Sequence, residues 1–167
     1  MLSKTMETAL NTQIQAEYTA FYLYLSMQAY FHRQNLDGFA AWMAAQSAEE
    51  AGHAQRLFDH ILERNGTVTL AEIPAPKQDW KSPLGAVQDA LEHEKKVTKM
   101  INDLFKQAID EEDAATRIFL HWFVTEQVEE EANVDRIVSR LKMGDGSPAV
   151  LLMIDSELGQ RPATDGD

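Results

Sequence analysis

Cysteine is absent from this chain of 167 residues, and proline and glycine are few, with five and eight residues. The lack of cysteine excludes disulfides, thiol redox chemistry, iron–sulfur clusters and cysteine-bound structural zinc. No apolar run approaches the roughly 20 residues that a membrane-spanning helix needs. The amino-terminal segment MLSKTMETAL also has no signal-peptide core. We therefore expect a soluble, cytoplasmic protein without a membrane partner.

Basic residues are scarce as well. The chain has 15 lysines and arginines against 27 aspartates and glutamates, which gives a formal net charge of −12 at pH 7. A protein that binds duplex nucleic acid needs the opposite sign, so we expect no nucleic-acid partner. Hydrophobic residues make up 44% and charged residues 25%, as in a globular domain with a sizeable core. Cations are the natural ligands of such an acidic chain.

Long stretches without helix breakers are the main structural signal. Neither glycine nor proline occurs before Gly38 or between Gly85 and Gly144. The residues in these stretches are mostly good helix formers, and no segment alternates with the period of two that a strand shows. The sequence therefore predicts an all-α protein.

Start and stop signals divide the chain into five predicted helices. Asp37 is expected to cap the second helix, and Ser82 followed by Pro83 is expected to start the third. An acidic run at residues 110–113 separates the third helix from the fourth. The predicted bounds are approximately 4–33, 38–64, 83–109, 114–143 and 148–158. We expect one domain over residues 1–158 and a disordered tail over 159–167.

The connection between the second and third helices is unusually long. Residues 66–82 contain Pro74 and Pro76 and show no helical pattern. Fully extended, this link could span at most roughly 56 Å, enough to run the length of a helix bundle. The expected fold is therefore a four-helix bundle of two antiparallel hairpins, joined by one long crossover and followed by a short fifth helix.

Each long helix carries a polar residue in the register of its apolar, inward-facing residues. These polar residues repeat after seventy-seven positions: Glu17, Glu50 and His53 become Glu94, Gln127 and Glu130. Each hairpin thus brings one carboxylate and an i, i+3 pair of side chains to the core, the layout of a di-metal carboxylate site. The ligand types suit Fe(II), with Mn(II) and Zn(II) as alternatives. His32, His60, His93 and His121 lack comparable partners, and we expect them to be structural or exposed.

Unpaired carboxylates in an apolar core cost several kcal/mol each, and bound divalent cations remove that cost. The segment from Glu50 to His53, together with Glu17, Glu94 and residues 125–130, resembles the bacterial non-haem ferritins. The resemblance extends over about residues 1–158. It implies a ferroxidase that oxidises Fe(II) with dioxygen or hydrogen peroxide at a diiron centre within each subunit. It also implies storage of the ferric product as a mineral inside a homo-oligomeric shell of twenty-four subunits.

The resemblance also implies roles for individual residues. The first iron position corresponds to Glu17, Glu50 and His53. The second corresponds to Glu50 as a bridge, Glu94 and Glu130, with Gln127 close by. A third corresponds to Glu49, Glu126, Glu129 and Glu130. Tyr24 matches a tyrosine beside the centre that can supply an electron, and Trp122 is a nearby aromatic residue.

Two departures from related proteins exclude haem as an expected cofactor. Haem-binding relatives place methionine directly before the site histidine, where this chain has Gly52. They also use a second Glu-x-x-His motif, whereas residues 127–130 of this chain read Gln-Val-Glu-Glu and contain no histidine. Iron access is left open, because residues 114–125 contain no carboxylate, and residues 110–113 are either an access point or an ordinary helix end. Two other functions stay open: a diiron oxidase or peroxide scavenger without storage, and a helical interaction module with a vestigial site.

Overall fold

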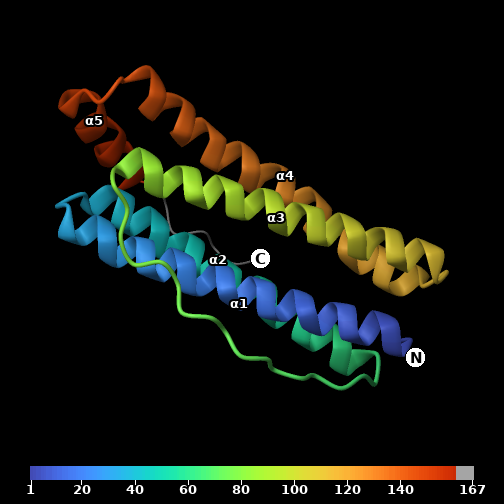
Figure 1. The fold of residues 1–167 in the computed structure, drawn as a ribbon. Coiled ribbons are helices and arrows are strands. Elements are labelled where there is room, and N and C mark those ends of the chain that lie inside the picture. Colours follow the sequence, from blue (N-terminus) through green and yellow to red (C-terminus); the bar gives the residue numbers. More distant parts are fainter. Residues whose placement is uncertain (161–167) are drawn as a thin grey trace.

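A computed structural model describes residues 1–160 of the chain. This part of the chain forms five α-helices and no strand (Figure 1). Their bounds are α1 Lys4–Arg33, α2 Asp37–Glu63, α3 Pro83–Asp110, α4 Ala114–Met143 and α5 Pro148–Leu158. The predicted fold class is confirmed, with helix bounds that agree to within one or two residues. Most of the expected tail, residues 161–167, lies outside the described residues.

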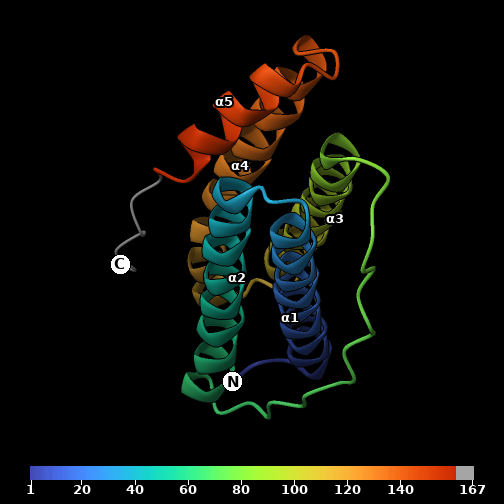
Figure 2. The ribbon, with the colours of Figure 1, turned by 90° about the vertical axis from the view of Figure 1, so that its left-hand side faces the viewer.

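The four long helices form two hairpins that pack against each other. α1 contacts α2, α3 contacts α4, and α1 also contacts α3. The link between α2 and α3 runs along the side of the bundle from one end to the other, as Figures 1 and 2 show. α5 crosses the end of the bundle where α3 begins and contacts α2 and α4. None of the described helices is both long and apolar enough to cross a membrane.

The start of α2 differs from the prediction. Asp37 is the first helical residue rather than the cap, and the residue before it makes no side-chain capping bond. The Asp37 carboxylate instead lies 3.0 Å from His32 Nδ1. The backbone amide of Phe39 donates to Asp155 Oδ1 of α5 at 2.8 Å. Gly38 permits this contact, because a Cβ at that position would lie 1.7 Å from the Asp155 carbonyl oxygen.

The acidic turn before α4 is part of the helix end. Asp113 caps α4 by accepting a hydrogen bond from the Thr116 amide at 3.1 Å, and it pairs with Arg64 at 3.0 Å. Next to this pair, His60 stacks on Phe119 with ring centroids 3.9 Å apart and bonds to Thr116. Burial and the Arg64 charge lower the His60 pKa. The Asp113 carboxylate is therefore engaged by the cap of α4 and by its ion pair with Arg64.

The apolar core consists of two clusters, one toward each end of the bundle. On α1, one cluster ends at Ile14 and the other begins at Tyr24. On α3, the clusters meet between Leu91 and Val97. The interval on each long helix is where the repeated polar residues occur. The fold therefore places a polar layer at mid-bundle, with apolar side chains above and below it.

Candidate metal centre

The repeated polar residues form a buried layer to which all four long helices contribute. Each is between 0 and 4% exposed: Glu17, Glu50, His53, Glu94, Gln127 and Glu130. Ionisable side chains are almost never buried this completely unless they are paired or bind a cation. The layer is therefore a candidate metal centre.

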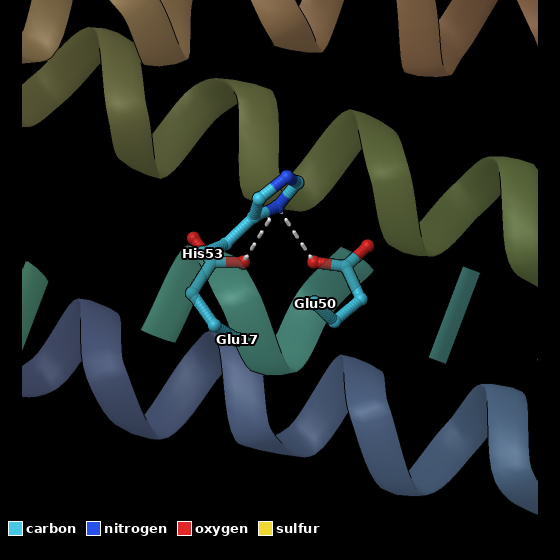
Figure 3. A group of neighbouring side chains, drawn as sticks. All are labelled: Glu17, Glu50 and His53. Atoms are coloured by element: carbon cyan, nitrogen blue, oxygen red, sulfur yellow. Dashed lines mark hydrogen bonds and ion pairs between the residues drawn. The ribbon is translucent and has the colours of Figure 1, made fainter. Parts of the chain in front are cut away.

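His53 and two carboxylates form the first half of the centre (Figure 3). His53 Nδ1 lies 3.0 Å from Glu50 Oε2 and 4.0 Å from Glu17 Oε2. These side chains each offer a ligand atom, all within 4.8 Å of one another. Glu17 Oε2 is buried and has no hydrogen-bond partner in the described part of the chain. A divalent cation among the three side chains would satisfy that oxygen.

Glu94 and Glu130 are two further carboxylates of the layer, and among residues 1–160 Glu94 falls within no group of ligand atoms of this kind. The Tyr24 hydroxyl donates a hydrogen bond to Glu94 Oε1, and Gln127 Nε2 donates to Glu94 Oε2 at 3.2 Å. Glu130 Oε2 accepts a hydrogen bond from Gln46 Nε2 at 2.7 Å. Both carboxylates thus have a neutral donor on at least one oxygen.

A second group of possible ligands includes one residue of the first. His53, Glu126 and Glu130 offer ligand atoms within 4.8 Å of one another. Glu126 is half-buried, as is Glu49, whereas Glu129 is exposed. Of the four residues predicted for a third iron position, the structure therefore groups Glu126 and Glu130 with His53. Glu49 and Glu129 lie outside both groups, although their charges act on Glu126.

Burial is the main influence on the carboxyl groups of this layer. It raises the pKa of Glu17 and of Glu50 well above the ordinary value, and neighbouring carboxylates raise both further. Burial also raises the pKa of Glu94, against the opposing effect of its hydrogen bonds from Tyr24 and Gln127. The pKa of Glu130 rises to about 8, from burial and from the nearby Glu94 and Glu49 charges. Without a cation, these groups resist joint ionisation at neutral pH.

Aromatic rings close one side of the His53 imidazole. Trp122 lies edge-on to it at 5.4 Å between centroids, and Phe123 does so at 5.9 Å. The Arg56 guanidinium carbon lies 3.9 Å from the Trp122 ring centroid, within the range of a cation–π interaction. These contacts restrict the orientation of the imidazole.

Three contacting residues, Gln13, Gln46 and Arg56, were not among the predicted site residues. Gln13 donates a hydrogen bond to Glu17 Oε1 at 2.8 Å, and Gln46 donates to Glu130. One signal was available in the sequence, because each glutamine precedes a site glutamate by four positions on a helix.

An all-helical bundle with facing carboxylates and a Glu-x-x-His pair in its core has the architecture of the ferritin-like carboxylate proteins. The ferritin-like domain of the ferritin family matches residues 7–144, and the chain belongs to this iron-storage family. The bacterial non-heme ferritin of Bacteroides fragilis strain 638R is 44% identical over 161 residues, covering 96% of this chain and all of that protein. The bacterial non-heme ferritin of Staphylococcus aureus strain MRSA252 is 38% identical over 162 residues, covering 96% of this chain and 97% of that protein.

Solved structures support the same assignment. The open pore ferritin of the archaeon Archaeoglobus fulgidus has a TM-score of 0.95 and 45% identity, covering 97% of this chain and 100% of that one. A humanized archaeal ferritin has a TM-score of 0.96 and 45% identity, covering 98% of this chain and 99% of that one. The resemblance to bacterial non-haem ferritins is confirmed.

Proposed function

We propose that this protein is a ferroxidase that oxidises Fe(II) to Fe(III) and stores the product as ferric oxyhydroxide mineral. The observation that carries the proposal is the buried polar layer, in which carboxylates with raised pKa values face one another between two apolar clusters. Such a layer is unfavourable in the metal-free protein, and divalent cations compensate it. The ferritin-like family supports Fe(II) as that cation.

Two Fe(II) ions would bind side by side as substrates. Glu17, Glu50 and His53 would bind the first, and Glu50 would bridge to a second bound by Glu94 and Glu130. Gln127 would remain close to the second ion through its bond to Glu94. Adjacent ions can deliver two electrons to one oxidant molecule. With dioxygen, two Fe(II) and two protons yield two Fe(III) and one hydrogen peroxide; with hydrogen peroxide, they yield two Fe(III) and two waters.

Full reduction of dioxygen to water needs four electrons, two more than a pair of Fe(II) ions supplies. Tyr24 can provide one, because its hydroxyl is bonded to Glu94, a carboxylate able to accept its proton on oxidation. Burial raises the Tyr24 pKa well above the ordinary value, so the phenol stays protonated at neutral pH. A third Fe(II) near Glu126 and Glu130, with Glu49 and Glu129 nearby, can provide the other.

The storage part of the proposal requires an enclosed cavity. The curated and solved relatives are named as ferritins, and we propose that this chain likewise forms a homo-oligomeric shell of twenty-four subunits in the cytoplasm. Haem has no part in the proposal, because Gly52 stands where haem-binding relatives have methionine.

Stopped-flow oxidation of Fe(II) by the purified shell tests the proposal. Glu50→Ala and His53→Ala should each slow the fast phase by well over tenfold, because oxidation needs two ions bound together. Glu63→Ala removes an exposed carboxylate from the same helix and should leave the rate unchanged. An unchanged fast phase in Glu50→Ala would refute the assignment. Size-exclusion chromatography of the iron-loaded protein separates a storage shell from an oxidase that retains no mineral.

A further inference from the structure

Gln13 and Gln46 each engage one carboxylate of the metal centre without belonging to the predicted ligand set. Gln13 Nε2 donates to Glu17 Oε1 at 2.8 Å, within α1. Gln46 Nε2 donates to Glu130 Oε2 at 2.7 Å, across the bundle from α2 to α4. Gln13 is 1% exposed and Gln46 is 0% exposed. The two hydrogen bonds therefore lie in a water-poor environment, where they orient their acceptors strongly.

Packing alone does not account for Gln13. Its carbonyl oxygen, Oε1, is buried and has no hydrogen-bond partner in the described part of the chain. Burying an unsatisfied amide oxygen is unfavourable, and an apolar side chain of similar length would fill the position without that cost. The feature that distinguishes Gln13 from such a side chain is its donor to Glu17.

The hydrogen bond from Gln13 gives the two oxygens of Glu17 different surroundings. Oε1 accepts from the amide, while Oε2 has no hydrogen-bond partner among residues 1–160 and lies 4.0 Å from His53 Nδ1. Oε2 therefore faces the position proposed for the first Fe(II). A carboxylate fixed in this way loses less conformational entropy when it binds a cation.

Building on the proposed function, we propose that Gln13 and Gln46 are positioning residues, each for one of the two Fe(II) positions. Gln13 orients Glu17 toward the first ion, and Gln46 orients Glu130 toward the second. Each glutamine thereby sets the affinity of its own position. Outer partners of this kind typically contribute tenfold to a hundredfold to metal affinity.

Methionine is the appropriate replacement because it keeps the length of the side chain and lacks the donor. Length matters at Gln13, which also lines a groove of about 280 Å³ between α1 and α3, together with Thr12 and Asp103. A truncation to alanine would enlarge this groove as well as remove the donor to Glu17, so the effect of the lost hydrogen bond could not be measured separately. Gln13→Leu serves as a second variant if Gln13→Met does not assemble.

The experiment is a titration of the assembled, metal-free shell with Co(II), followed by visible absorption and calorimetry. Co(II) binds such ligands without reacting with dioxygen on this timescale, and its absorption bands report the coordination of each position. We expect two Co(II) per chain in the buried layer of the parent protein, one at each of the two positions. Gln13→Met should weaken one binding step by about tenfold to a hundredfold, and Gln46→Met should weaken the other.

Double-mutant cycles connect each glutamine to its carboxylate. In a Glu17→Ala background, Gln13→Met should have no further effect on Co(II) affinity, whereas Gln46→Met should still weaken binding. In a Glu130→Ala background the pattern should reverse. The metal-free Gln13→Met shell should melt at or above the temperature of the parent shell, whereas a merely structural role would lower it.

The outcomes separate this inference from the proposed function. Two-ion binding that both methionine variants retain at full affinity overturns the positioning roles and leaves the metal centre intact. The positioning roles are also overturned if the losses of Co(II) affinity in the methionine variants add in full to the losses caused by Glu17→Ala and Glu130→Ala. A parent protein that binds no Co(II) in the buried layer overturns the proposed function itself.

Discussion

Replacing Glu130 with glutamine should stabilise the metal-free protein at neutral pH. Glu130 is 4% exposed, and its pKa rises from the ordinary 4.5 to about 8, mainly through burial. At pH 7 the folded chain must therefore hold a proton that the unfolded chain releases. Linkage gives about 1.4 kcal/mol for each pH unit above the unfolded pKa, or roughly 3 kcal/mol at pH 7. Glutamine avoids this cost and can still accept the hydrogen bond from Gln46.

The sign of the pH dependence follows from the raised pKa. Below pH 4.5 the Glu130 carboxyl is protonated in both the folded and the unfolded chain, and it costs the folded state nothing. As the pH rises from 4.5 to about 8, the unfolded chain loses this proton more readily than the folded chain, so the folded state is progressively destabilised. Glu130→Gln should therefore exceed the parent by roughly 3 kcal/mol at pH 7 and by about 1 kcal/mol or less at pH 5. For a chain of this length, 3 kcal/mol corresponds to roughly 6–12 °C in Tm.

Thermal melts of the metal-free protein, followed by circular dichroism at pH 5 and pH 7, measure this difference. Glu129→Gln is the matched control, because Glu129 is the exposed neighbour on the same helix and its replacement should change Tm little. Excess Co(II) should reverse the order, because the parent binds the cation more tightly than Glu130→Gln does. Equal Tm values for the parent and Glu130→Gln at pH 7 would refute the reasoning.

Three further predictions concern other parts of the molecule. Tyr24→Phe should leave Fe(II) binding intact and change the decay of the absorbance transient that follows mixing with dioxygen. Identical transients and identical radical yields by electron paramagnetic resonance in the variant and the parent would show that Tyr24 has only a packing role. The protein should show no Soret band after haem addition and desalting, and a bis-methionine haem spectrum would contradict this. Gly38→Ala should destabilise the end of the bundle by about 1–3 kcal/mol, because the new Cβ would overlap Asp155. Hydrogen exchange at the Phe39 amide should accelerate in that variant, and unchanged protection would show that α5 accommodates the methyl group.

Much of the fold could be predicted because its signals are local. Breaker-free stretches and the Ser82–Pro83 start predicted the long helices, and the polar repeat indicated which faces meet. The cap of α2 could not be predicted in this way. Its acceptor is Asp155, 116 positions away, and the contact exists only because α5 crosses the end of the bundle.

The candidate site shows the same limit. The repeat placed six polar side chains in one layer because helical periodicity alone determines their faces. Gln46 had no such signal toward Glu130, since their contact depends on how α2 and α4 lie side by side. Glu129 illustrates a different point: it is one residue, or about 100° of helix, from Glu130, and the structure leaves it exposed. Helical phase alone predicts that Glu129 and Glu130 face different environments.

Anaerobic soaking of crystals with Fe(II), followed by anomalous diffraction at the iron edge, tests the central claim most directly. We predict two iron peaks per chain in the buried layer, one among Glu17, Glu50 and His53 and one among Glu50, Glu94 and Glu130. Glu50→Ala should lose the paired arrangement. A fully soaked parent crystal with no iron in this layer, or with a single ion that Glu50 does not contact, would contradict the account.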